Sequence, residues 1–407
     1  MFVRISDHTS RPSRRQAGAL LLALTAAVVT ACGGGGDAGL GAGPAAAGVQ
    51  ATAYAAGPIS GFGSIIVNGV RYDDSAAAVV DDDDTSHDRE KLKLGMMVEI
   101  DGHSVDAARA LGKALRIRFG SEIVGPVSAV DSVGGSLVVL GQTVLVTDTT
   151  VFDDSLAGGL AGLSVGTVIE VHAQFDAATA MYTAKRIEPK ADATSYRLRG
   201  VMANLDSTAK TFTIGAEVIN YAAVAEAALP NNLANGMRVR VRLQTTQVNG
   251  EWVATALRAG MQKPEDRAEA HLRGIVSAWA SSADFELNGL KVDASGASFP
   301  DGSAGIVLGA RVEVHGKIQN GVLVASKVEL EERHVLESLR FELHGQISAL
   351  DTIAKTFKLR GLTVGYGGEV TFKDGTEADL ADGRKVEVKG RLGSMRNRIE
   401  AARIEFE

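Results

Sequence analysis

The sequence predicts an all-β protein in which one small barrel is repeated five times, and three observations support this prediction. A glycine followed by alternating apolar residues recurs at spacings of 68, 75, 74 and 71 residues. A turn signal such as Asn68-Gly69 follows each opening, and such pairs suit tight hairpins because Asn and Gly accept positive φ. Each unit then carries a strand with strict apolar–polar alternation, such as Val312-Glu313-Val314-His315. Self-similarity at a nearly fixed period is typical of repeat architectures.

The elements of one unit follow in a constant order. The openings are Gly57-Pro58-Ile59-Ser60, Gly125-Pro126-Val127-Ser128, Gly200-Val201-Met202-Ala203, Gly274-Ile275-Val276-Ser277 and Gly345-Gln346-Ile347-Ser348. A hairpin, a variable stretch, the alternating strand and a closing strand come next. Five strands with an insert between the third and fourth are the layout of an OB-type barrel. We therefore expect five tandem OB-fold-like five-stranded barrels, called repeats 1 to 5, at residues 55–120, 121–190, 196–260, 270–332 and 341–407.

The N-terminal segment is typical of an export signal. Several arginines precede a 15-residue apolar run from Ala17 to Ala31, which is too short to span a bilayer as a helix. The run ends Val29-Thr30-Ala31-Cys32, which resembles the lipobox of bacterial lipoproteins. That resemblance implies a signal peptide over residues 1–31 and lipidation, for example by palmitate, of Cys32. The alternative is an ordinary signal peptide followed by a core cysteine.

Residues 32–54 are rich in Gly and Ala and have little side chain to bury, so we expect a flexible tether. The lipid would attach the protein to the cell envelope. Gly33 after the cysteine is compatible with the outer membrane, facing the periplasm or the cell surface. The sequence does not choose between general secretion and twin-arginine export.

The repeated motifs resemble a known family. The elements are Gly-x-apolar-Ser, Phe-x-Leu-x-Gly, Phe-x-Asp, Gly-x-x-Val-Glu-Val-x-Gly and Ala-x-x-Ile-Glu. Together they are similar to a bacterial domain of unknown function, DUF number 5666, which occurs in tandem on exported lipoproteins. The resemblance covers about residues 55–407, and the first unit departs most because it lacks Phe-x-Asp and carries an acidic run. The family implies no activity and no catalytic residues.

Composition excludes several classes of function. One cysteine rules out a disulfide framework and cysteine-rich zinc sites. A net charge of -7 argues against a general nucleic-acid binder, which needs a basic surface to displace counterions. No phosphate loop, nucleophile elbow or zinc-protease motif is found, so we expect no cofactor and no catalytic residues.

The first charged candidate is the acidic run Asp81, Asp82, Asp83 and Asp84. Hard cations such as calcium want several oxygen ligands at once, so these carboxylates are weak candidates for a metal site. The run lacks the spaced pattern of a calcium loop. We therefore expect a solvated acidic loop, and no metal.

The second candidate set lies in repeat 3. Arg238, Arg240 and Arg242 share one face of a strand, and OB barrels bind single strands on basic faces with stacking aromatics. Aromatic residues are not interleaved here, so we expect a salt-bridged surface. Trp252 and Trp279 can either stack on a sugar ring or fill a core, and we expect the core.

The histidines give no repeated chemistry. His172 and His315 occupy the same position of the fourth strand, where other units have Asp, Arg or Lys, so we expect exposed strand histidines. The sequence thus favours a non-catalytic envelope lipoprotein that acts as a multi-barrel binding or structural module. Its expected partners are the membrane, through the anchor, and an envelope protein or glycan, but not nucleic acid. The alternatives are an oligosaccharide- or peptidoglycan-binding protein, or a hydrolase with a site composed across units.

Overall fold

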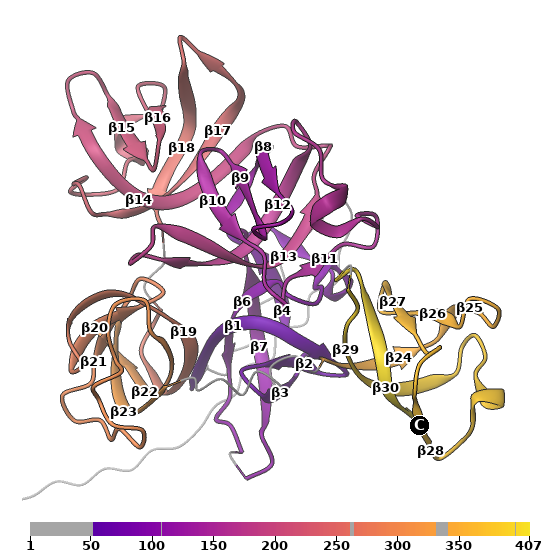
Figure 1. The fold of residues 1–407 in the computed structure, drawn as a ribbon. Coiled ribbons are helices and arrows are strands. Elements are labelled where there is room, and N and C mark those ends of the chain that lie inside the picture. The colour runs from indigo at the N-terminus through magenta and orange to yellow at the C-terminus, as the bar shows by residue number, and fades with distance from the viewer. Residues whose placement is uncertain (1–51, 107, 261–263, 331–340, 395) are drawn as a thin grey trace, which may run out of the picture. The chain divides into compact units, whose positions relative to one another are not determined.

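The computed structural model describes residues 52–106, 108–260, 264–330, 341–394 and 396–407 (Figure 1). The expected signal peptide, Cys32 and all of the tether before residue 52 lie outside the described residues. The described part consists of β-strands and short 3-10 turns, which confirms the all-β prediction. In it, no helix has the length and apolar character needed to cross a membrane.

Repeats 1 and 2 have the following elements. Repeat 1 contains β1 (Ala53–Phe62), β2 (Ile65–Val67), β3 (Val70–Asp73), β4 (Ala78–Asp81), β5 (Ser86–His87), η1 (Arg89–Lys91), β6 (Met97–Gly102) and β7 (Leu111–Phe119). Repeat 2 contains β8 (Ile123–Asp131), β9 (Ser136–Val139), β10 (Gln142–Leu145), β11 (Val151–Phe152), η2 (Gly159–Gly162), β12 (Val168–Asp176) and β13 (Met181–Pro189).

Repeats 3 to 5 follow the same plan. Repeat 3 contains β14 (Tyr196–Asp206), β15 (Thr211–Ile214), β16 (Glu217–Asn220), η3 (Glu226–Ala228), β17 (Arg238–Val248) and β18 (Glu251–Ala259). Repeat 4 contains β19 (Arg267–Ser281), β20 (Asp284–Leu287), β21 (Leu290–Asp293), β22 (Arg311–Gln319) and β23 (Val322–Leu330). Repeat 5 contains β24 (Phe341–Gln346), β25 (Ser348–Asp351), β26 (Thr356–Leu359), β27 (Leu362–Gly365), β28 (Thr371–Lys373), η4 (Glu377–Asp379), β29 (Lys385–Leu392) and β30 (Arg398–Phe406).

Each repeat closes into a five-stranded barrel. In repeat 3, β14, β15 and β16 pair antiparallel in sequence order, and β16 then pairs in parallel with β18. β17 closes the ring between β18 and β14 (Figure 1). The same circuit occurs in the other four repeats. The short turns η1 to η4 all lie between the third and fourth barrel strands, where the sequence predicts the variable insert.

The Val-Glu-Val-x-Gly motif ends in glycine because the backbone leaves no room for a side chain there. The pairing register shifts at Gly102, Gly316 and Gly390, which marks a β-bulge in the fourth strand. A Cβ at Gly316 would lie 2.2 Å from the carbonyl oxygen of Val324 on the closing strand. Gly102 and Gly390 face a backbone oxygen at 2.4 and 2.3 Å. The absence of a side chain therefore lets the barrel bend sharply at this corner.

Strand pairing also joins different repeats, and it does not follow their order along the chain. β1 pairs in parallel with β19 of repeat 4 through residues 53–56, and with β24 of repeat 5 at Gly61 and Phe62. β8 pairs antiparallel with β14, which joins repeats 2 and 3. The cores largely follow the same grouping, since one apolar cluster combines repeats 1 and 5 with Val151 of repeat 2, and another combines repeats 2 and 3. Repeat 4 has a core of its own, to which repeat 1 adds Tyr54.

Candidate functional site

The outward positions of the first and fourth barrel strands form a charged face in repeats 3, 4 and 5, which we call the outer face. In repeat 3 these strands are β14 and β17, and Arg197 pairs in register with Arg242 and Arg199 with Arg240. Alternation along each strand places all four side chains on the same side of the sheet. Four neighbouring guanidinium groups repel one another, so this face requires a countercharge.

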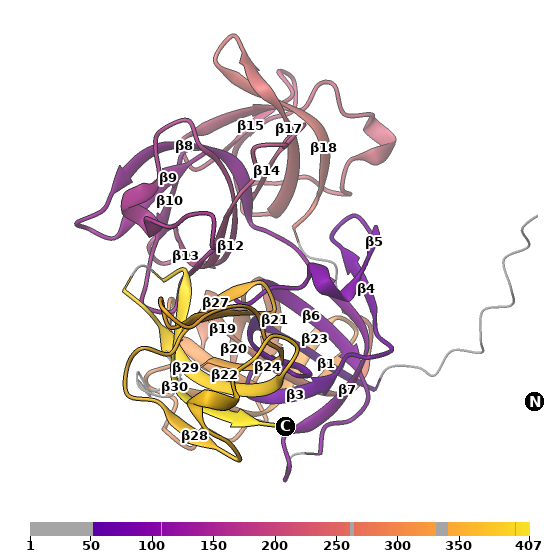
Figure 2. The ribbon, with the colours of Figure 1, turned by 90° about the vertical axis from the view of Figure 1, so that its right-hand side faces the viewer.

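The acidic run of repeat 1 supplies that countercharge. Oδ2 of Asp82 lies 2.7 Å from Nη2 of Arg199 and 3.1 Å from Nη1 of Arg240. Oδ1 of Asp83 lies 3.0 Å from Nη2 of Arg240, and the same carboxylate pairs with Arg242. Figure 2 shows the β4–β5 hairpin of repeat 1 reaching toward the barrel that contains β17 and β18. The side chains of Asp82, Arg199 and Arg240 are only 11%, 13% and 10% exposed.

Local hydrogen bonds fix the acidic run in this shape. Oδ1 of Asp81 accepts the backbone N–H groups of Asp83 and Thr85 at 2.9 and 3.0 Å. Asp84 remains exposed and pairs with Arg116 and Arg118 of its own repeat. The expectation of a solvated acidic loop is therefore wrong for Asp82 and Asp83, because their carboxylates are held between arginines of another barrel.

A third carboxylate completes the network. Glu122 lies 3.4 Å from Arg199 and 2.8 Å from Arg238. All three arginines proposed from the sequence as binding residues, Arg238, Arg240 and Arg242, are thus paired within the chain. Burial lowers the pKa of Arg240, and it raises the pKa of nearby Glu99 to about 7. The network is consequently a buried contact between barrels.

The two tryptophans have different environments. Trp252 is buried in the core of repeats 2 and 3, packs edge-on against Tyr196 and donates from Nε1 to Glu217 at 2.7 Å. Trp279 is 47% exposed, although its Nε1 donates to the carbonyl of Ile306 at 2.7 Å. The expected core role therefore fits Trp252 and is wrong for Trp279.

His172 also differs from the expectation of an exposed histidine. It is fully buried in β12, its Nδ1 lies 2.8 Å from the carbonyl oxygen of Gly120, and its Nε2 has no hydrogen-bond partner in the described part of the chain. Burial lowers its pKa, against the opposing charge of Glu170. A buried, perturbed histidine is what a composite hydrolase site would need. His172 nevertheless does not line either of the two cavities described for this structure.

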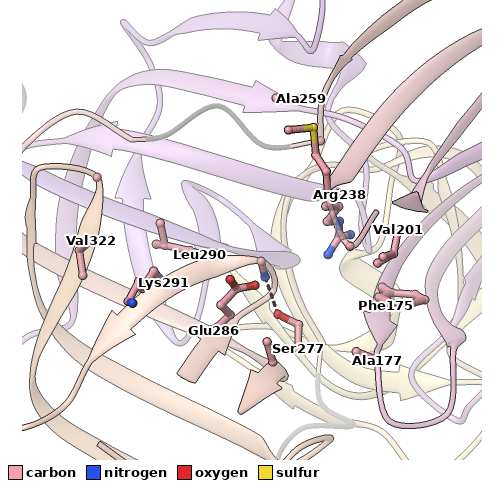
Figure 3. A pocket seen from close by; sticks show the side chains of 16 residues that line it. Phe175, Ala177, Val201, Arg238, Ala259, Ser277, Glu286, Leu290, Lys291 and Val322 are labelled. Atoms are coloured by element: carbon pink, nitrogen blue, oxygen red, sulfur yellow. Dashed lines mark hydrogen bonds between the residues drawn. The ribbon is translucent and has the colours of Figure 1, made fainter. Parts of the chain in front are cut away.

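The larger cavity has a volume of about 610 Å³ (Figure 3). The residues that line it include Phe175 from repeat 2, Arg238 from repeat 3, and Ser277, Glu286 and Lys291 from repeat 4. The Arg238 guanidinium lies 5.6 Å from the centre of the Phe175 ring, and burial raises the pKa of Glu286. Because Arg238 also pairs with Glu122, its charge is already neutralised. Neither tryptophan lines this cavity.

The sequence reasoning missed two clusters of possible metal ligands in the described residues, and the one on the outer face of repeat 4 consists of His271, Glu313 and His315. His271 and His315 are register partners on β19 and β22. The signal was available, because the first and fourth strands pair in every repeat. His271 stands three residues before the opening glycine, Gly274. Pairing that part of the first strand with the alternating strand would have placed His271 beside His315.

Comparison with known proteins identifies the repeated unit. A family model described as "Domain of unknown function (DUF5666)" matches residues 56–110, 124–188, 273–329 and 344–405, which is more than half of the chain. Repeat 3 is not among the matched regions, although it has the same strand circuit. No curated protein matches the chain. One solved structure, "drosophila Unr CSD456", is 14% identical and covers 53% of this chain and 98% of its own, with a TM-score of 0.14. A likeness that weak carries no argument.

Proposed function

The chain belongs to the DUF5666 family, and on that premise we propose that it is a non-catalytic lipoprotein of the cell envelope whose barrels interlock into a structural and binding module. The observation that carries this proposal is the seating of Asp82 and Asp83 among the arginines of repeat 3. An outer face that could have received a ligand is used to attach one barrel to another.

Further contacts between barrels support the structural role. Arg186 is buried, pairs with Asp153 and Glu188 of its own repeat, and donates to the carbonyl of Leu94 in repeat 1 at 3.3 Å. Arg71 of repeat 1 pairs with Glu342 of repeat 5. Repeat 1, which departs most from the family motifs, therefore contacts each of the other four repeats.

The module would be held at the membrane by lipidated Cys32 on the tether that precedes β1, in the outer membrane. Its partner would be an envelope protein or a glycan. A sugar-binding role is a second candidate, and the exposed indole of Trp279 favours it, because sugars stack on accessible aromatic rings. Binding at several barrels at once would gain from effective concentration.

The proposal is tested by complementing a deletion strain and measuring envelope integrity as resistance to detergent. We expect the parent chain to restore resistance. We expect neither Cys32→Ser, which removes the anchor, nor Asp82→Asn/Asp83→Asn, which removes the contact between barrels, to do so. A matched control is Asp106→Asn, which changes an exposed ion pair in the same repeat. Full rescue by Cys32→Ser would refute the anchored module, and full rescue by the double Asn variant would refute the structural role.

A further inference from the structure

We propose that His271, Glu313 and His315 form a binding site for a divalent first-row transition metal ion, with zinc as the representative ion. The proposal is independent of the role of the whole protein, because all three residues lie within repeat 4. Each residue offers one ligand atom, and the three atoms lie within 4.8 Å of one another.

The barrel strands bring these side chains together. His271 on β19 and His315 on β22 are direct cross-strand partners, and such partners have Cβ atoms roughly 5 Å apart. Glu313 stands two residues before His315 on β22, so it projects from the same face. The site is thus built on two paired strands, which hold their side chains more rigidly than loops do.

The donor atoms converge on one point. Oε1 of Glu313 lies 2.5 Å from Nε2 of His271 and 3.1 Å from Nε2 of His315. The two imidazole rings are stacked, with centroids 4.3 Å apart and an angle of 15° between their planes. Ligands of a tetrahedral zinc ion stand roughly 3.3 Å apart, given zinc–nitrogen and zinc–oxygen distances of about 2.0–2.1 Å. To admit the ion, the donor atoms must therefore move apart and the two imidazole rings must turn out of the stack, so that both Nε2 atoms point at the ion.

The donor set also suits such an ion. Two imidazoles and one carboxylate are ligands that zinc accepts in proteins.

The surroundings orient the carboxylate and leave a coordination position open. Arg273 pairs with Oε2 of Glu313 at 2.5 Å and so leaves Oε1 for the ion. Such outer contacts orient metal ligands in known sites. His315 is part-exposed, so solvent can supply a fourth ligand. Three protein ligands plus one exchangeable position is the arrangement of open zinc sites.

A similar cluster in repeat 5 provides the matched control. Glu342, His344 and Glu387 occupy equivalent strands, but Nη1 of Arg71 lies 3.1 Å from Nε2 of His344. Lys389 also lies 2.9 Å from Glu387 and 3.4 Å from Glu342. Arg71 thus contacts the single imidazole and Lys389 contacts both carboxylates, whereas Arg273 in repeat 4 pairs with Oε2 of Glu313. We therefore place the site in repeat 4 only.

The test is isothermal titration of the full chain carrying Cys32→Ser, which removes its one thiol as a competing ligand, with zinc chloride. We expect one saturable site. His271→Gln/His315→Gln should weaken binding at least 100-fold, while His344→Gln should leave it unchanged within twofold. His315→Gln alone, which changes the more exposed ligand, should weaken zinc binding at least tenfold. Circular dichroism would verify that the double variant and each single variant fold. The proposal is overturned if the parent shows no saturable binding, if both folded glutamine variants in repeat 4 bind as tightly as the parent, or if His344→Gln abolishes binding.

Discussion

Asp82→Asn tests whether the contact between repeats 1 and 3 stabilises the protein. The carboxylate of Asp82 lies 2.7 Å from Arg199 and 3.1 Å from Arg240, with all three side chains nearly buried. Removing one partner of a buried ion pair costs about 3–5 kcal/mol, because the remaining charge is left desolvated. Arg199 retains Glu122 and Arg240 retains Asp83, so we expect the lower end, about 3 kcal/mol.

The assay is urea unfolding of the full chain carrying Cys32→Ser and Trp279→Phe, in which fluorescence reports on Trp252 in repeat 3. Combining Asp82→Asn with Arg240→Gln should give a coupling free energy of about 2 kcal/mol, as residues in one charge network are not independent. The matched control is Asp106→Asn, which breaks a 2.8 Å ion pair with Arg109 whose side chains are 40% and 75% exposed. That variant should cost at most about 0.5 kcal/mol, as expected for a surface pair. A coupling below about 0.5 kcal/mol, or equal losses for Asp82→Asn and Asp106→Asn, would refute the reasoning.

Three further predictions concern other parts of the molecule. Gly390→Ala should destabilise repeat 5 by about 1–3 kcal/mol, because its Cβ would lie 2.3 Å from the carbonyl oxygen of Glu400; a thermal midpoint equal to the parent's would contradict the bulge argument. Burial raises the pKa of Glu99 to about 7, above its unfolded value, so its contribution to stability is full below about pH 4 and is lost as the pH rises through 7. Glu99→Gln should therefore narrow the difference between the thermal midpoints at pH 5 and pH 8, and an unchanged difference would show that another group titrates. Trp279→Phe should remove most of the fluorescence that iodide quenches while Trp252→Phe should not, and the reverse pattern would contradict the burial of Trp252.

The barrel could be predicted from the sequence because its cause is local. Alternation in Val312-Glu313-Val314-His315 assigns one side of the strand to the core, and the structure buries Val312 and Val314. The turn at Asn68-Gly69 adopts positive φ at both residues, as the residue types require. These signals recur in all five repeats, so the strands predicted in one repeat support those predicted in the others.

The contacts between barrels could not be predicted in the same way. Asp82 and Arg240 stand 158 residues apart in the sequence, and no local pattern around either residue predicts a contact with the other. The acidic run by itself predicts a solvated loop because isolated carboxylates favour water, but carboxylates paired with guanidinium groups can be buried. The sequence also hid the equivalence of β4 with β11, because repeat 1 has Val79 where repeat 2 has Phe152. Val79 pairs in register with Ile117 of the closing strand, as Phe152 pairs with Ile187.

The placement of β1 bears on how the chain acquires its fold. One edge of its N-terminal half pairs with β6, and the other is completed by β19, whose partner residue His271 follows Ala55 by more than 200 residues. Its C-terminal half pairs with β24, which lies further still along the chain. An unpaired strand edge is a template for association with another chain. Repeat 1 therefore cannot cover its own edges and is exposed to mispairing until repeats 4 and 5 have formed.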